Sequence, residues 1–203
     1  MKKLLFVSTM LGCIVSIFVV MYHLQPQHTW LPEVTPVGLV NKATAKPTTP
    51  PIQLRKKNKP AMLFLGLSRT LQYGKTKLFQ TDVRSLWKQF LAKKSGYPIQ
   101  HRNDSKVYAI YSSYSMKSVR LTLGYRVKSF RDQHHGWKKL SIKPLSYMVL
   151  QGKGKWEPAI KMLWKHAQTN KIKRNYTAEL EVYPSTLFSK PGGAVELWLS
   201  SHN

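Results

Sequence analysis

Two segments near the C-terminal end, 177–183 and 194–200, are predicted strands that combine carboxylates with aromatic rings. Because side chains alternate along a strand, each segment gathers these residues on one face and its aliphatic residues on the other. The residues that share the carboxylate-bearing faces are Glu179, Glu181 and Tyr183 in the first segment and Glu196 and Trp198 in the second. A carboxylate shielded from water beside aromatic rings attracts cationic or amphipathic molecules. If the aliphatic faces pack under helices, the opposite face is predicted to form a ligand-binding site.

The same pattern has a simpler interpretation. A polar sheet face in water, with its glutamates paired to lysines, would show the same alternation. The chain carries 33 Lys and Arg against 8 Asp and Glu, a formal net charge of +25, and most of this excess lies after residue 60. Such a surface favours anionic partners such as lipid headgroups, polysaccharide or nucleic acid. The spacing of the residues alone leaves both interpretations open.

Two helices are predicted from apolar residues that recur every three or four positions. The first begins near Thr81 and Asp82, and the second has Pro158 in its first turn. Their apolar stripes consist of Val83, Leu86, Trp87, Phe90 and Leu91 in the first helix and of Ile160, Leu163, Trp164 and Ala167 in the second. Both helices contain the sequence Leu-Trp-Lys, which indicates an internal repeat.

Strand-like runs surround these helices. They are 61–71, 107–113, 121–127, 138–151 with a bend at Pro144, 177–183 and 194–200. Together with the helices, the order is strand, helix, strand, strand, and then the same again. This order predicts an α+β domain of two strand-helix-strand-strand modules side by side, with a ligand cleft at the seam between them.

The N-terminal segment predicts a single transmembrane helix ahead of this domain. After Lys2 and Lys3, the uncharged run 4–21 would span about 27 Å as a helix, close to the thickness of the hydrocarbon core of a bilayer. Because no Lys or Arg follows until Lys42, the positive-inside rule places the N-terminus in the cytoplasm. We therefore expect a single-pass protein of a bacterial inner membrane with an extracytoplasmic C-terminal domain. A cleaved signal peptide and, through Cys13, a lipoprotein are the alternatives.

Composition divides the chain into three parts. Residues 1–22 are the predicted anchor, 23–59 a Pro-rich basic linker with too little apolar surface to fold, and 60–203 the folded domain. Cys13 is the only cysteine, which excludes an intrachain disulfide and a zinc site built on several cysteines. We expect no cofactor, no metal site and no set of catalytic residues.

Seven short motifs between residues 61 and 200 follow one another in an order typical of one family. They are Gly66-Leu67-Ser68-Arg69, Leu86-Trp87-Lys88-Gln89-Phe90, Val107-Tyr108-Ala109-Ile110-Tyr111, Leu123-Gly124-Tyr125-Arg126-Val127, Ser146-Tyr147-Met148-Val149, Tyr176-Thr177-Ala178-Glu179-Leu180-Glu181-Val182-Tyr183 and Val195-Glu196-Leu197-Trp198. In this order they resemble the GyrI-like small-molecule-binding domain, also called the AraC-type or bacterial transcription activator effector-binding domain.

The resemblance implies a cleft between the two modules in which a buried Glu and aromatic residues hold a drug-like, often cationic molecule. The residues that it and the strand pattern assign to ligand binding are Glu181, Glu196, Tyr147, Trp198 and Tyr183. The regulators of this family also carry a DNA-binding helix-turn-helix, and no such pattern is recognisable in this sequence. Sequence-specific DNA binding is therefore not expected.

Three functions are compatible with these observations. The first is a membrane-anchored module that binds a small amphipathic effector, in this family often a cation, in a Glu- and aromatic-lined cleft. The second is a basic surface that binds anionic lipid, polysaccharide or nucleic acid. The third is hydrolysis, since some GyrI-like proteins use the cleft Glu as a general base. No second catalytic group is evident, so a binding protein is favoured over an enzyme.

Overall fold

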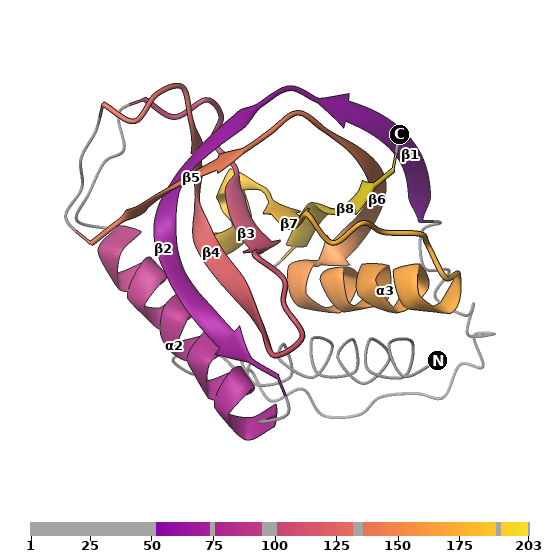
Figure 1. Cartoon of the computed structure of the whole chain (residues 1–203), viewed down its shortest axis with the longest axis horizontal. Coiled ribbons are helices and arrows are strands. Elements are labelled where there is room, and N and C mark those ends of the chain that lie inside the picture. Colours follow the sequence, from indigo (N-terminus) through magenta and orange to yellow (C-terminus); the bar gives the residue numbers. More distant parts are fainter. Residues whose placement is uncertain (1–51, 74–75, 95–100, 132–135, 190–191, 203) are drawn as a thin grey trace, which may run out of the picture.

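The structure is a computed structural model that describes residues 52–73, 76–94, 101–131, 136–189 and 192–202. These residues form one eight-stranded antiparallel sheet with two helices on the same face (Figure 1). In chain order the elements are β1 (Gln53–Lys59), β2 (Met62–Gln72), α2 (Thr76–Lys94), β3 (Val107–Ser112), β4 (Ser118–Val127), β5 (Lys138–Ile142), β6 (Leu145–Lys155), α3 (Trp156–Thr169), β7 (Ala178–Tyr183), the 3-10 helix η2 (Ser185–Phe188) and β8 (Gly192–Ser201).

The sheet consists of two copies of one module. The first module is β2-α2-β3-β4 and the second is β6-α3-β7-β8, and in both the last strand lies between the other two. Strands β3 and β7 pair at the centre and join the modules, in the strand order β1-β6-β8-β7-β3-β4-β2-β5. The predicted α+β fold with a repeated strand-helix-strand-strand order is confirmed.

The strand that precedes each module pairs with the other module. Strand β1 lies against β6, and β5 lies against β2. The sequence interpretation of 138–151 as one strand bent at Pro144 is therefore wrong, because β5 pairs with β2 at one edge of the sheet and β6 pairs with β1 and β8 near the other. Lys143 and Pro144 form the short connection that carries the chain from one module to the other.

The sheet also begins earlier than the sequence analysis expects. Residues 53–59 belong to the linker assigned to 23–59, yet they form β1 and pair with β6 at seven positions. Arg55, Lys57 and Lys59 give this strand no apolar alternation, so its pairing depends on backbone hydrogen bonds. Charged side chains are typical of an edge strand, where they discourage pairing with other chains.

The centre of the sheet is buried on both faces. One core lies between the helices and the sheet, and a second lies on the opposite face around Phe64, Tyr108 and Trp198. For this reason every residue of β3 and β7 is buried. Helix α2 begins at Thr76 rather than near Thr81, and Leu91 of its predicted apolar stripe is 39% exposed.

In the part of the chain that the structure describes, no helix combines the length and the apolar character needed to cross a bilayer. The predicted anchor, 1–22, and the linker up to residue 51 lie outside the described residues.

Gly66 of β2 lies opposite Gly124 of β4, where a side chain would meet the backbone of the facing strand. A Cβ atom on Gly124 would lie 2.3 Å from the carbonyl oxygen of Leu65, a distance that only a backbone shift could relieve. We expect Gly124→Ala to lower the free energy of unfolding by about 3 kcal/mol, the upper range for overpacking. Urea denaturation followed by tryptophan fluorescence measures this loss.

The matched control is Gly193→Ala, because a Cβ there would lie 3.4 Å from Cγ of Pro184, an ordinary contact. The control should change the free energy of unfolding by less than about 1 kcal/mol. Equal losses in the two variants would contradict the close approach of β2 and β4.

Candidate functional site

The five residues that the sequence assigns to ligand binding lie on two faces of the sheet. Glu181 and Tyr183 face the helices, since Glu181 pairs with Leu197 of the helix-side core and Tyr183 belongs to that core. Tyr147, Glu196 and Trp198 lie on the opposite face, where Glu196 pairs with Val182 of the second core. The ligand-binding roles of all five remain predictions, but these residues do not line one common cleft.

The difference arises on β7. The sequence analysis expects the aliphatic residues of both C-terminal strands to pack under the helices, and on β8 Val195 and Leu197 do so. On β7, Leu180 and Val182 instead enter the second core, and the glutamates turn toward the helices. The sequence pattern gave no sign of this second core, which requires apolar residues on the outer face of β7.

Glu181 is fully buried at the seam between the modules, and three neutral groups donate hydrogen bonds to its carboxylate. Nε1 of Trp164, on α3, donates to Oε1 at 2.7 Å, and the hydroxyl of Tyr183 donates to Oε2 at 2.6 Å. The hydroxyl of Tyr111, on β3, donates to Oε1 at 3.2 Å. Within the described residues, no basic side chain forms an ion pair with Glu181.

Burial raises the pKa of Glu181 from 4.5 to about 7, even though the hydrogen bonds from Tyr183, Trp164 and Tyr111 lower it. The charged form lacks the solvation of water, and neutral donors replace that solvation only in part. Glu181 can therefore change its protonation state near neutral pH.

Glu179, two residues earlier on the same strand face, has a cation of its own. Nη1 of Arg174 lies 3.1 Å from its Oε2, and both side chains are nearly inaccessible to water. The hydroxyl of Tyr114 donates to the same oxygen at 2.7 Å. The guanidinium of Arg174 lies 4.4 Å from the ring centroid of Tyr176 and 5.7 Å from that of Trp164. The chain thus already holds one cation between a buried carboxylate and aromatic rings.

Aromatic rings from both modules surround Glu181. Tyr183 makes edge-to-face contacts with Trp87 of α2, at 5.7 Å between ring centroids, and with Trp156 of α3, at 6.1 Å. Tyr111 contacts Trp164 edge-on at 6.0 Å. Trp156 is only partly buried, at the first position of α3. The seam predicted to be a ligand cleft is therefore filled, around Glu181, by the protein's own rings.

On the opposite face, Glu196 and Trp198 have partners within the chain. Nε1 of Trp198 donates to Oε2 of Glu196 at 2.8 Å, and Nη2 of Arg55 lies 3.8 Å from Oε1. Nζ of Lys59 lies 4.5 Å from the ring centroid of Trp198. The ring centroids of Trp198 and Tyr147 are 5.7 Å apart. Strand β1 thus supplies the cations for this group.

Sequence reasoning missed the residues that hold the two buried carboxylates. The sequence analysis places Trp164 in the apolar stripe of a helix and Tyr111 in a strand, and it does not single out Arg174. The contact of Tyr111 with Glu181 follows from the pairing of β3 with β7, which the sequence does not reveal. Nothing in the sequence marks Arg174 among so many basic residues.

No cluster of three or more His, Cys, Asp or Glu side chains within the described ranges is arranged to hold a metal ion. His134 and His135 lie outside those ranges.

The repeated modules and the buried carboxylate at their seam define a GyrI-like effector-binding domain, as the sequence motifs predict. Residues 57–200 match the family described as "Integron-associated effector binding protein", and the chain belongs to this family. No curated protein is similar enough in sequence to count as a match.

Solved structures share the fold at low sequence identity. The integron cassette protein VCH_CASS2 from the mobile metagenome of Vibrio cholerae has a TM-score of 0.58 and 13% identity, over 73% of this chain and 95% of that one. SAV2435, solved bound to tetraphenylphosphonium, has a TM-score of 0.60 and 10% identity, over 74% and 94%. A putative bacterial transcription regulation protein from Staphylococcus aureus MU50 has a TM-score of 0.59 and 11% identity, over 74% and 99%.

The raised pKa of Glu181 predicts a pH-dependent stability. Between pH 4.5 and about 7, the folded protein keeps a proton that the unfolded chain releases, so the free energy of unfolding falls as the pH rises. The total contribution is of the order of 3 kcal/mol, complete below pH 4.5 and lost above about 7. In Glu181→Gln this contribution is absent, and the difference from the wild type is measured by urea denaturation at several pH values.

The control variant is Glu196→Gln on the other face, which leaves Glu181 and its donors in place and should retain the fall in stability between pH 4.5 and about 7. Burial also raises the pKa of Glu179, so both variants retain the pH dependence of that residue. A profile of Glu181→Gln parallel to that of the wild type would contradict the raised pKa.

Proposed function

We propose that the domain binds a lipophilic cation at the seam between its modules, with Glu181 as the counter-ion. The observation that carries this proposal is the carboxylate of Glu181, which is fully buried and held by neutral donors alone. A negative charge in such a place is costly unless a positive charge approaches it. A bound cation supplies that charge.

The neighbouring carboxylate supports the choice of ligand. Glu179 meets the same conditions of burial and aromatic surroundings, and there Arg174 supplies the positive charge. The same chemistry at Glu181 calls for a cation from outside the chain. Because Trp87 and Trp156 pack against the ring of Tyr183, which is bonded to Glu181, a large apolar cation is favoured over a small hydrated one.

Ligand entry requires these rings to move, since Glu181 has no exposed surface in this structure. Trp156 is the partly exposed member of the group and contacts Tyr183, whose hydroxyl is bonded to Glu181. A rotation of these two side chains would open a path from solvent to the carboxylate. The ligand would then occupy the space left by the rings of Trp156 and Tyr183. Binding of this kind selects an open conformation that is less populated in the free protein.

One relative gives the probe. SAV2435 was solved with tetraphenylphosphonium, a cation whose charge is enclosed by four phenyl rings. Its low sequence identity to this chain supports a common fold, and the choice of this ligand for the present protein is part of the proposal.

Titration of the full chain with tetraphenylphosphonium, followed by calorimetry, tests the proposal. Glu181→Gln should weaken binding at least about tenfold, because it removes the counter-ion and little of the aromatic surface. The matched control is Glu196→Gln, which should stay within about twofold of the wild type because Glu196 lies on the other face. Tetraphenylborate, of the same shape and opposite charge, is titrated separately and should show no dependence on Glu181.

Protonation of Glu181 competes with a cation, so the affinity of the wild type should rise about tenfold from pH 6 to pH 8 and that of Glu181→Gln should not. Equal affinities of the wild type and Glu181→Gln at pH 8 would contradict the proposed role of this carboxylate.

The proposal includes attachment to the inner membrane through residues 1–22, with the effector-binding domain outside the cytoplasm. It rests on the uncharged run 4–21 and on Lys2 and Lys3 before it. An arginine in the middle of such a helix is costly in the bilayer. The paired change Val15→Arg and Val19→Arg should therefore release the protein from carbonate-washed membranes, whereas Val34→Arg and Val37→Arg in the linker should not.

Protease treatment of spheroplasts then reports on orientation, since an extracytoplasmic domain is digested without lysis. A wild-type protein that is lost from the membrane after the carbonate wash, or that has been shortened at its N-terminus, would contradict the anchor.

A further inference from the structure

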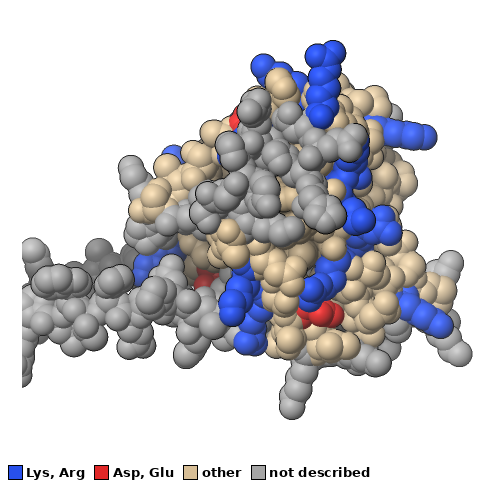
Figure 2. Space-filling view, turned by 90° about the vertical axis from the view of Figure 1, so that its left-hand side faces the viewer, with Lys and Arg blue, Asp and Glu red and all other residues tan. Residues whose placement is uncertain are grey.

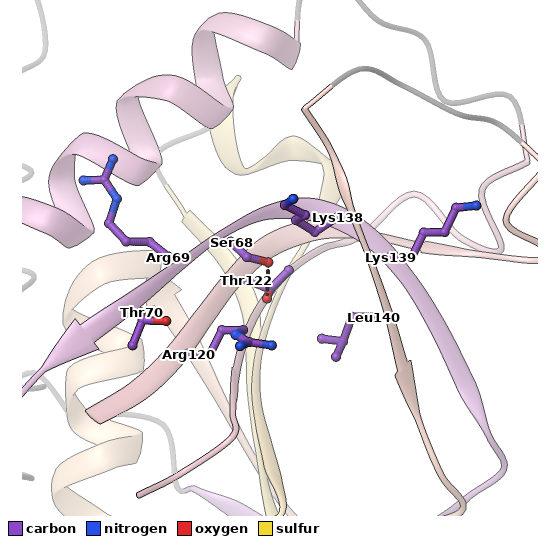
Figure 3. A pocket seen from close by; sticks show the side chains of 8 residues that line it. All are labelled: Ser68, Arg69, Thr70, Arg120, Thr122, Lys138, Lys139 and Leu140. Carbon is purple, nitrogen blue, oxygen red and sulfur yellow. Dashed lines mark hydrogen bonds between the residues drawn. The ribbon is translucent and has the colours of Figure 1, made fainter. Parts of the chain in front are cut away.

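A cavity of about 380 Å³ lies on the sheet face opposite the helices, where β4, β2 and β5 are neighbours (Figure 3). We call it the β2–β4–β5 pocket and define it by the residues whose side chains share this face, Ser68, Thr70, Arg120, Thr122, Lys138 and Leu140. None of them belongs to the Glu181 site.

The floor of the pocket has two hydroxyl groups that are hydrogen-bonded to each other, and one of their two protons has no acceptor in the part of the chain that the structure describes. Ser68 and Thr122 are directly paired across β2 and β4, and their hydroxyl oxygens lie 2.7 Å apart. One hydroxyl donates to the other, which leaves the second proton without an acceptor among the described residues. Thr122 is fully buried and Ser68 is partly exposed, and both line the pocket, so a molecule bound there could accept this proton from whichever hydroxyl carries it.

Two cations of the pocket are also free. Arg120 and Lys138 form no ion pair within the described residues, and no acidic side chain lines the pocket. The guanidinium of Arg120 turns toward the hydroxyl pair and Leu140 (Figure 3). Two further basic residues line the wall but are engaged elsewhere. Arg69 donates to Asp82 at 3.0 Å and points away from the pocket, and Nζ of Lys139 lies 5.7 Å from the ring centroid of Phe130.

The rest of the chain adds to this positive potential, since the whole chain carries 33 Lys and Arg against 8 Asp and Glu. Figure 2 shows this excess on one side of the molecule, where many Lys and Arg side chains and few acidic ones are visible. Next to the hydroxyl pair, Gly66 and Gly124 contribute no side chain to the pocket face.

We infer that the β2–β4–β5 pocket binds a small molecule that carries a phosphate group. A phosphate accepts several hydrogen bonds from different directions, which matches one guanidinium, one ammonium and the free proton of the hydroxyl pair. The cavity is larger than a bare phosphate needs, and Leu140 offers an apolar contact to the rest of the molecule. The ligand class is therefore a phosphate monoester with a short organic group, and this site is separate from the cation site at Glu181.

Calorimetric titration of the full chain with phenyl phosphate tests the inference. The variant Arg120→Gln with Lys138→Gln should bind at least about tenfold more weakly, since it loses two charge-assisted contacts. The matched control is Lys153→Gln with Lys165→Gln, two exposed lysines on β6 and α3 whose loss changes the net charge equally. This control should stay within about twofold of the wild type.

A second variant, Thr70→Glu, adds a negative charge at an exposed position of the pocket and should also abolish binding without disturbing the core. Short-chain phosphatidic acid carries the same phosphate group on a lipid. Its displacement of phenyl phosphate from the wild type would support the pocket and identify a lipid headgroup as the source of the phosphate.

Two results would overturn the inference. Equal weakening by the two double variants would show diffuse attraction by the basic surface rather than a site. Tight binding of heparin or duplex DNA together with no measurable binding of phenyl phosphate would show a surface for extended polyanions.

Discussion

The pairing of β3 with β7 is the constraint on which the rest of the structure depends. It joins the two modules and places Tyr111 opposite Glu179, and Ala109 opposite Glu181. Because Ala109 is small, the carboxylate of Glu181 has room beside it for the indole of Trp164 from α3. Every residue of the two strands is buried, so a charge placed on them has no access to water. The seam of this fold is therefore a place where a carboxylate must find its partners in the protein or in a ligand.

The two glutamates of β7 differ in the partners that the protein supplies to their carboxylates. Glu179 is balanced by Arg174, and the guanidinium of Arg174 also donates to the hydroxyl of Tyr176 at 3.0 Å. Glu181 receives hydrogen bonds from neutral groups, which stabilise the carboxylate without neutralising it. Under the proposed function, a ligand that brings the opposite charge accounts for an ionisable side chain at this position.

Much of this architecture could be predicted from the sequence, because the Leu-Trp-Lys helices and the strand alternation follow from local periodicity. Which face of β7 meets the helices could not be predicted, because alternation shows only which residues share a face. Leu180 and Val182 pack into the second core around Phe64 and Trp198, and the glutamates therefore face the helices. Strand β1 was missed for a related reason: its pairing depends on the edge that β6 offers, which no property of residues 53–59 reveals. Partners such as Arg174 are defined only by the folded chain.

The strong positive charge of the domain bears differently on its two candidate sites. At the surface it attracts anions and repels cations over about 8 Å at physiological salt, which favours a ligand of the β2–β4–β5 pocket. A cation must cross this field to reach the seam, and its attraction to Glu181 develops only at close range. Lipophilic cations are suited to this path, because apolar contact with Trp156 and Tyr183 can hold them before the charges meet. If a cation binds at Glu181 as proposed, hydrophobic area rather than charge alone would therefore select the cation that crosses this surface.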